Sequence, residues 1–143
     1  RREVHDPRGV GVAEFDAAGI VHFSAFFLWM ESVEHEMLRA CGIRVVEPDA
    51  GGPGVDASWP RVSVACDYVS AIRFGDEVDV AVTVEKLGTS SVTYGFAFTH
   101  AGVPVAKGRV VAVRCLMRAG RRPESVPIPD DIAGRLAPYR VGA

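Results

Sequence analysis

Two amino acids, asparagine and glutamine, are entirely absent from this chain of 143 residues. Their absence removes every acceptor site for N-linked glycosylation, because that modification needs an asparagine. It also excludes every reaction mechanism that depends on a side-chain amide. Polar chemistry in this protein must therefore come from other side chains or from the backbone.

Cysteine is scarce, and its spacing is unlike that of a metal or redox motif. The three cysteines, Cys41, Cys66 and Cys115, are far apart and form no CxxC pair. This usage predicts reduced thiols in a cytoplasmic protein. The four histidines and three cysteines never approach the spacing of a zinc site. No Lys-Ser/Thr follows the glycines at 51–54, so they are not a phosphate loop, and we expect neither a metal nor a cofactor.

The chain also lacks a long apolar run and a strong net charge. Its most apolar stretch, from Ala17 to Met30, contains His22 and Ser24. A membrane span needs about 20 apolar residues, so this stretch predicts a buried helix and its lead-in rather than a span. The net charge is only −2, which gives no global field that favours nucleic acid.

The first part of the chain predicts one strand and one long helix. A strand is expected over Val10–Phe15, and a turn follows at Asp16–Gly19. From Ser24 to Ala40 the apolar residues recur at spacings of three and four, which predicts a helix. Its first two turns are apolar all round, so we expect that end to be deeply buried. A loop rich in Gly, Pro and Asp follows from Glu47 to Ser58.

The second part of the chain predicts strands joined by hairpins. Apolar and polar residues alternate over 61–68, 78–85 and 92–99, which indicates half-buried strands. The continuously apolar run Val110–Val113 indicates a strand covered on both faces. Residues 118–129 resemble a loop, and Asp130 or Asp131 is expected to cap a short helix through Leu136. The prediction is a single α+β domain over residues 1–143, with an antiparallel five-stranded sheet around one long central helix.

The segment most informative about chemistry is Glu14-Phe15-Asp16-Ala17-Ala18-Gly19-Ile20-Val21-His22-Phe23-Ser24. It places a carboxylate, Asp16, one tight turn before an apolar helix. A helix N-terminus offers backbone N–H groups and a partial positive charge. Such donors can stabilise the oxyanion that develops when a thioester carbonyl is attacked, and the N–H of Phe23 is a candidate. Asp16 can act there as nucleophile or as general base.

This segment resembles the hydroxybenzoyl-CoA thioesterase family, which includes the small thioesterases associated with the Tol–Pal system. Three further stretches fit that resemblance, namely Phe74–Val78, Gly88–Ser91 and Ala106–Gly108. The resemblance implies the hot-dog fold, with Asp16 as catalytic acid and the Phe23 N–H as oxyanion donor. It also implies a homo-oligomer, a dimer or a dimer of dimers, whose active sites are shared between two chains. The chain is thereby expected to hydrolyse an acyl-CoA or acyl-carrier-protein thioester.

The resemblance also indicates residues around the acyl group. Glu31 stands where one branch of the family contacts a phenol; the alternative is a solvated acid paired with His35 one turn on. His22 is either a proton shuttle or part of the entrance. Aromatic residues crowd the helix start, at positions 23, 26, 27 and 29, and suggest an aromatic or bulky acyl chain. The remaining pocket candidates are Gly19, Val21, Trp59, Val62 and Ser63. The last three begin a strand that either contributes to the pocket of the neighbouring subunit, as the resemblance implies, or is an ordinary strand entry.

The charge is uneven along the chain. Residues 1–60 carry 5 Lys and Arg against 10 Asp and Glu, whereas residues 61–143 carry 11 against 8. The late cations either form a solvated surface or, since arginine binds phosphate bidentately, hold the phosphates of coenzyme A. Alternatively, they meet an acidic carrier protein. These candidates are Lys107, Arg109, Arg114 and Arg118.

Two rival functions share the same fold. A hot-dog dehydratase or hydratase also begins its helix with a His-Phe pair, as His22-Phe23 does here. That pair leads into a Pro-containing run in the dehydratases, whereas here it leads into Ser24-Ala25. A hot-dog dimer can also bind acyl-CoA without turnover, as a sensor or accessory subunit. The dehydratase interpretation leaves the turn at Asp16–Gly19 unexplained, and tight acyl-CoA binding without turnover would distinguish the sensor from the thioesterase.

Overall fold

The computed structural model describes residues 4–9, 23–73 and 75–142. The bounds of its elements are β1 (Val4–Gly9), α1 (Phe23–Ala40), β2 (Asp56–Ser58), β3 (Arg61–Tyr68), β4 (Glu77–Leu87), β5 (Ser91–His100), β6 (Val103–Val113), β7 (Cys115–Met117), β8 (Glu124–Ser125), α2 (Asp130–Leu136) and the 3-10 helix η2 (Ala137–Tyr139). Neither α1 nor α2, the α-helices of the described residues, has the length and apolarity that crossing a bilayer requires.

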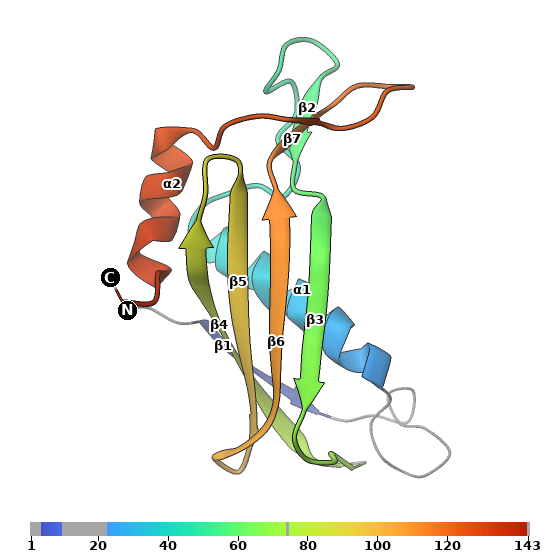
Figure 1. The fold of residues 1–143 in the computed structure, drawn as a ribbon, viewed down its shortest axis with the longest axis vertical. Helices are drawn as coiled ribbons and strands as arrows, with labels where there is room; N and C mark the ends of the chain where they lie inside the picture. Colours follow the sequence, from blue (N-terminus) through green and yellow to red (C-terminus); the bar gives the residue numbers. More distant parts are fainter. Residues whose placement is uncertain (1–3, 10–22, 74, 143) are drawn as a thin grey trace.

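Five strands form one antiparallel sheet in the order β1-β4-β5-β6-β3, and α1 lies across one face of this sheet (Figure 1). The α+β architecture predicted from the sequence is thus confirmed. A second, three-stranded sheet, β2-β7-β8, stands at one end of the molecule and was not predicted. Two of its strands, β2 and β8, fall inside segments that we expected to be loops. They are only 3 and 2 residues long, which is too short for an alternating pattern to reveal a strand.

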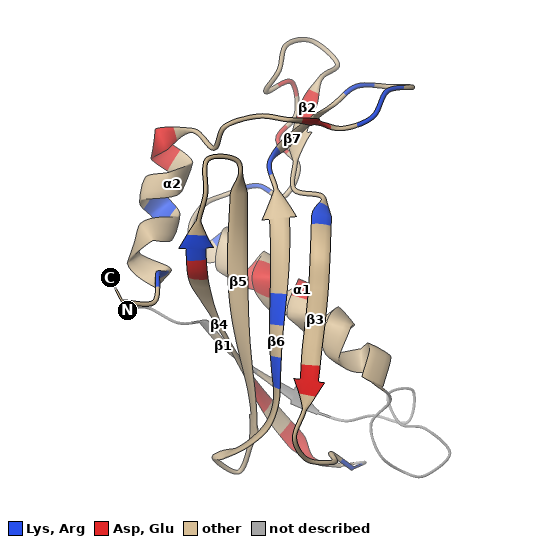
Figure 2. Ribbon diagram, in the orientation of Figure 1, with Lys and Arg blue, Asp and Glu red and all other residues tan. Residues whose placement is uncertain are grey.

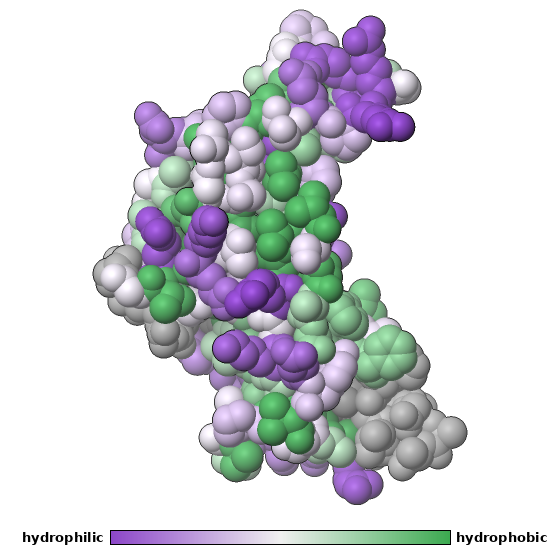
Figure 3. All heavy atoms as spheres, viewed as in Figure 1, coloured by the Kyte–Doolittle hydropathy of each residue, from purple (hydrophilic) through white to green (hydrophobic). Residues whose placement is uncertain are grey.

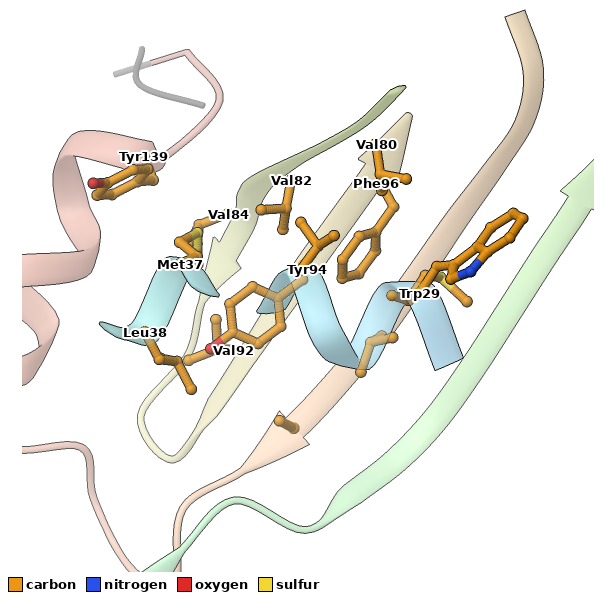
Figure 4. Close-up of a cluster of buried hydrophobic side chains, with 14 of the residues drawn as sticks. Trp29, Met37, Leu38, Val80, Val82, Val84, Val92, Tyr94, Phe96 and Tyr139 are labelled. Atoms are coloured by element: carbon orange, nitrogen blue, oxygen red, sulfur yellow. The ribbon is translucent and has the colours of Figure 1, made fainter. Parts of the chain in front are cut away.

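The core lies between α1 and the strands β4 and β5 (Figure 4). The alternate valines of β4, from Val78 to Val84, are fully buried, and so are Val92, Tyr94 and Phe98 of β5. These residues are the apolar members of the predicted alternating pattern, which is confirmed for both strands. The helix approaches β6 closely at Gly108, where an added Cβ atom would collide with Sδ of Met30. A glycine at that position lets α1 pack directly on the sheet.

The alternating pattern over 61–68 predicted a half-buried strand, and this prediction is wrong for β3. Val62 and Val64 are 63% and 44% exposed, and Tyr68 is 46% exposed. The reason is position, because β3 is the last strand of the sheet and has a neighbour, β6, on one side only within the described chain. The start of α1 is likewise less buried than predicted, with Phe23 60% and Leu28 69% exposed.

Two smaller predictions also need correction, and the prediction of the first strand is not tested. The first described strand, β1, spans Val4–Gly9, whereas the strand expected over residues 10–15 lies outside the described residues. Val111 and Val113 of β6 are half-buried rather than covered, because α1 packs on the opposite face of the sheet. The N-cap of α2 is Pro129, and no side chain caps that helix. Asp130 and Asp131 instead occupy its first turn, where acidic side chains favour the helix dipole.

Candidate active site

A hydrogen bond from Tyr68 and a cluster of rings fix the N-terminus of α1 to the sheet. The Tyr68 hydroxyl, at the end of β3, donates to the backbone oxygen of Phe23 at 3.1 Å. The ring of Phe26 packs edge-on against Tyr68, Trp29 and Phe98, with centroid distances of 4.9, 5.3 and 5.1 Å. The first turn of α1 therefore has a defined position, which is what a preorganised oxyanion donor requires.

Four of the predicted active-site residues, Asp16, Gly19, Val21 and His22, lie outside the described residues. The helix begins at Phe23, one residue before the predicted start. The backbone N–H of Phe23 thus belongs to the first turn of α1, as its predicted role demands. That role, like those of the other four, stays a prediction.

A groove runs along α1 where the helix faces the edge strand, and we call it the α1–β3 groove. Its volume is about 190 Å³, and its walls are largely apolar. The lining residues are Phe27, Leu28, Glu31 and Glu34 of α1, Arg61 and Val64 of β3, and Val110 of β6. Since Phe23, Phe27, Glu31 and Glu34 follow one another at steps of three or four, the groove extends the same helix stripe that begins at the N-terminus.

Glu34, near the middle of α1, is a fully buried carboxylate. Its Oε2 accepts two hydrogen bonds from Arg61, from Nη2 at 2.8 Å and from Nε at 3.2 Å. Burial raises the pKa of Glu34 above its ordinary value, although the charge and the hydrogen bond of Arg61 act to lower that pKa. None of the described residues donates a hydrogen bond to the other oxygen, Oε1. Glu34, which lines the groove, therefore has a buried carboxylate oxygen with unused acceptor capacity.

Two further polar groups lie near this ion pair. Nε2 of His35 is 3.1 Å from Nη2 of Arg61, so a neutral His35 ring can accept a hydrogen bond there. Burial and, next, the Arg61 charge lower the pKa of His35. The Tyr94 hydroxyl, on β5, is buried with no hydrogen-bond partner among the described residues. Burial raises the pKa of Tyr94, and the charge of Glu34 adds to that rise.

The predicted acyl-pocket residues of the described chain fall in different environments. Glu31 is exposed and lines the α1–β3 groove; the observed partner of His35 is Arg61 rather than Glu31. Trp59 is buried, with the Arg114 guanidinium 5.4 Å from its ring centre. Of the set expected to reach a neighbouring subunit, Val62 and Ser63 are exposed on the edge strand β3 and Trp59 is not.

The predicted coenzyme A contacts occupy two separate places (Figure 2). Lys107 and Arg109 lie in the middle of β6 beside a hollow of about 150 Å³, and Nε of Arg109 is 3.0 Å from Oε2 of Glu85. Arg114 follows the end of β6, where it is 5% exposed and binds Glu47 through Nη2 at 2.8 Å. Arg118, beyond β7, pairs with Glu124. A role in phosphate binding stays a prediction for all four, and Lys107 is the one with no ion pair among those that the structure records.

Sequence reasoning did not single out Glu34 and Arg61. A signal for Glu34 was present, because it stands four residues after Met30 and three before Met37, on the buried stripe of the helix. A charged residue on such a stripe needs a partner. The partner, Arg61, lies 27 residues further along the chain, beyond the reach of any helix-spacing rule.

Comparison with known proteins places these features in a family context. Residues 18–107, more than half of the chain, match the family model described as the thioesterase superfamily. A 1,4-dihydroxy-2-naphthoyl-CoA hydrolase from Synechococcus sp. strain RCC307 is 28% identical over 123 residues, which cover 83% of this chain and 89% of that relative. A hydrolase of the same name from Prochlorococcus marinus strain NATL1A is 30% identical over 99 residues, and the match covers 66% of each protein.

Solved structures show the same architecture. A predicted thioesterase from Bacillus stearothermophilus is 25% identical, with a TM-score of 0.78 and 99% of each chain covered. A 1,4-dihydroxy-2-naphthoyl-CoA thioesterase from Synechocystis has a TM-score of 0.78 over 95% of this chain and 96% of its own. Its identity of 16% shows the fold alone. The likeness confirms the hot-dog type of fold that the motif predicted.

Proposed function

The chain belongs to the thioesterase superfamily, and from this premise we propose that it hydrolyses the thioester of an acyl-CoA to the free acid and coenzyme A. The observation that carries this proposal is the α1–β3 groove, which follows the helix stripe that starts at Phe23. An acyl group can lie along the groove while its thioester carbonyl stands at the first turn of α1. The relatives described above, named as hydrolases of an aryl-CoA, support the same reaction.

In the proposed mechanism, Asp16 is either the nucleophile or the general base for a water molecule. Attack on the thioester carbonyl converts its oxygen into an oxyanion, and the backbone N–H of Phe23 stabilises that charge. Collapse of the intermediate breaks the C–S bond and releases the thiolate of coenzyme A, which takes up a proton. If Asp16 is the nucleophile, water then hydrolyses the mixed anhydride. His22, as a proton shuttle or as part of the entrance, completes the site.

For the acyl group we propose an aryl or other bulky apolar chain. The apolar walls of the groove, Phe27, Leu28 and Val64, suit such a chain. Glu31 lies in the same groove and supplies a polar contact on its exposed side. The dihydroxynaphthoyl group named for the relatives belongs to this class of acyl groups.

Replacement of the proposed catalytic carboxylate tests the function. We expect Asp16→Asn to lower kcat by about 10²-fold to 10⁴-fold, because the amide has almost the same shape but serves neither as base nor as nucleophile. Hydrolysis of an aryl-CoA is measured by release of free thiol, and circular dichroism checks the fold. A variant that hydrolyses within tenfold of the parent rate would contradict the assignment of Asp16.

We further propose that the protein is a dimer at least, and that two dimers associate. The edge strand β3 has unpaired backbone groups on its outer side within the described chain, and it exposes Val62 and Val64 beside Leu28 of α1. An exposed strand edge with apolar side chains is a template for pairing with another chain. A second copy of this chain fits, since the active sites of the family are shared between two chains.

Sedimentation of two matched lysine variants tests the proposed dimer. Val62→Lys places a charge on the β3 edge and is expected to weaken dimerisation. Val103→Lys places the same charge on the distant β5–β6 hairpin, where Val103 is 58% exposed, and is expected to leave the dimer intact. A folded and active parent monomer at micromolar concentration would contradict the proposal.

A further inference from the structure

We propose that the α1–β3 groove binds an elongated acyl group, and that Glu34, held by Arg61, accepts a hydrogen bond from a hydroxyl group at the far end of that chain. This inference rests on the proposed function, which places the thioester carbonyl at the first turn of α1. It makes Glu34 a residue that determines specificity, distinct from the contact predicted for Glu31.

The first support is the unused acceptor on Glu34. The side chain is fully buried, yet it lines a groove of about 190 Å³. Arg61 uses Oε2 twice, and none of the described residues donates to Oε1. A buried polar atom without a partner is costly, so water or a ligand donor is expected to satisfy it. A hydroxyl group on the substrate can replace such a water and form a charge-assisted hydrogen bond.

The second support is distance along the helix. Glu34 is eleven residues after Phe23, and a rise of 1.5 Å per residue separates their Cα atoms by about 16 Å along the axis. Helical side chains lean toward the N-terminus, so the Glu34 carboxylate stands roughly 12 Å from the first turn. The same reasoning puts the Glu31 carboxylate roughly 8 Å away. A hydroxyl on a single ring can reach Glu31, whereas only a longer acyl group reaches Glu34.

The third support is the shape and charge of the groove. The side chains between its two ends, Phe27, Leu28 and Val110, are apolar, and they suit an uncharged chain. A cavity of about 150 Å³ holds one benzene ring, so a groove of about 190 Å³ can hold an acyl group that continues beyond a single ring. Glu31 and Glu34 both line the groove and Arg61 pairs with one of them. A distal carboxylate would be repelled, and a hydroxyl donor would not.

Binding of non-hydrolysable ligands tests the inference separately from catalysis. The ligands are thioether analogues of acyl-CoA, in which a methylene group separates the carbonyl from sulfur. The main pair carries 10-hydroxydecanoyl and undecanoyl groups, which have equal length and differ only in the terminal OH or CH₃. Calorimetry is expected to show that the parent protein binds the hydroxylated member about tenfold to a hundredfold more tightly, because a charge-assisted hydrogen bond is gained.

Variants at the two groove carboxylates assign that preference to a residue. Glu34→Gln is expected to reduce the preference to about twofold, because a charged acceptor becomes neutral. Glu31→Gln, the matched control in the same groove, is expected to leave it unchanged. A shorter pair, 6-hydroxyhexanoyl and heptanoyl, is too short to reach Glu34, so its binding ratio should be the same in the parent and in Glu34→Gln.

A double variant without the buried charge controls for loss of folding, and Tyr94→Phe tests whether the Tyr94 hydroxyl competes for Oε1 of Glu34. Glu34→Met combined with Arg61→Leu replaces the ion pair by apolar side chains, a change that folded proteins tolerate, and should also abolish the preference. Tyr94→Phe removes the neighbouring buried hydroxyl and should leave the preference intact. If that hydroxyl instead occupies Oε1, the preference will be absent from the parent and will appear in Tyr94→Phe.

Three results would overturn the inference: equal binding of the main pair by the parent, a preference that survives Glu34→Gln in folded protein, or a preference lost in Glu31→Gln. Hydrolysis of decanoyl-CoA and of aryl-CoA by the parent and by Asp16→Asn is measured in parallel. Absence of turnover would contradict the proposed function, and it would leave the binding result for Glu34 to be judged by itself.

Discussion

The two sides of α1 face very different surroundings. Toward the sheet, the helix buries Met30, Val33 and Met37, and the inward-facing apolar side chains of β4 and β5 are buried with them (Figure 4). Toward β3, the same helix lines an open groove that contains a buried ion pair and is bordered by exposed apolar residues. One helix thus serves both as the centre of the core and as the wall of the candidate site.

The difference shows where stability and function are separated in this molecule. The side of α1 that faces β4 and β5, here called the closed side, stabilises the fold through apolar burial. The side that faces β3 is called the open side or groove side. The side of α1 that faces β3 retains features that cost free energy in an isolated chain, namely a buried charge and a strand edge that no described strand pairs with. Hydrophilic and hydrophobic residues are intermixed on the face of the molecule that Figure 3 shows. The groove side is therefore the part of the surface that ligand and partner binding would complete.

A large-to-small change on the closed side should have the largest effect on stability. Phe96 of β5 is 2% exposed, and Phe96→Ala is expected to lower the free energy of unfolding by about 4 kcal/mol, through lost burial and the cavity left behind. Urea denaturation measures this. Val103→Ala, at an exposed position of β6, is the control and should change the free energy of unfolding by less than about 0.5 kcal/mol. A loss below about 1 kcal/mol for Phe96→Ala would show that the core can collapse around the cavity.

On the groove side, removal of one member of the Glu34–Arg61 ion pair should lower the free energy of unfolding by somewhat less than Phe96→Ala does. Arg61→Leu leaves the Glu34 carboxylate buried and unpaired, and is expected to destabilise the fold by about 3 kcal/mol, at the low end for broken buried pairs. Glu34→Met combined with Arg61→Leu removes both charges and should recover most of that loss. Urea denaturation of both variants makes the comparison, and equal stabilities would show that the carboxylate finds water in the groove.

The Arg61→Leu effect should also depend on pH, because the folded pKa of Glu34 is raised above its value of 4.5. A group with a raised folded pKa contributes stability below its unfolded pKa, and this contribution is lost as pH rises through the folded pKa. Loss of Arg61 raises that folded pKa further. The destabilisation by Arg61→Leu should therefore be smallest near pH 4.5 and should grow as the pH rises.

Local patterns predicted the closed side well and the open side poorly. The alternation of Val78–Val84 and of Val92–Phe98 correctly identified β4 and β5, because central strands covered by a helix obey a rule of period two. The same alternation over β3 predicted burial and failed, because the exposure of Val62 and Val64 depends on β3 being the edge of the sheet. The order of strands in a sheet is a non-local property that no window of sequence contains.

The candidate site likewise has one part that the sequence predicted and one part that only the folded structure revealed. The turn at Asp16–Gly19 was predicted from adjacent residues and their resemblance to a family, and it stays a prediction because it lies outside the described residues. The pairing of Glu34 with Arg61 became visible only in the folded structure, because it joins a helix to a strand across a loop. The helix stripe could have flagged Glu34 as a buried charge. It could not have indicated which cation lies beside it or that one oxygen is left without a donor.

The smallest expected effect concerns His35, which contacts the groove residue Arg61. Its ring nitrogen Nε2 lies 3.1 Å from Nη2 of Arg61, so a neutral ring can accept a hydrogen bond from the guanidinium, whereas a protonated ring would place two donors and two positive charges together. Burial lowers the pKa of His35 below 6.5, Arg61 lowers it further, Glu31 acts to raise it, and Arg39 acts to lower it. The folded protein therefore releases the His35 proton at a lower pH than the unfolded chain does.

Between the folded pKa of His35 and its ordinary value of 6.5, the unfolded chain binds more protons than the folded protein does, so stability increases with pH in that range. The contribution of His35 should be fully present above pH 6.5 and should be lost as the pH falls through the folded pKa. His35→Gln supplies a neutral acceptor that does not titrate and serves as the reference. Urea denaturation from pH 5 to pH 7.5 should show the parent losing stability relative to His35→Gln as the pH falls. Titrations of Glu34 and other shared carboxylates largely cancel in this difference. A difference that is constant over the range would mean that His35 makes no pH-dependent contact with Arg61, and the polar contacts of Arg61 would then reduce to its pair with Glu34.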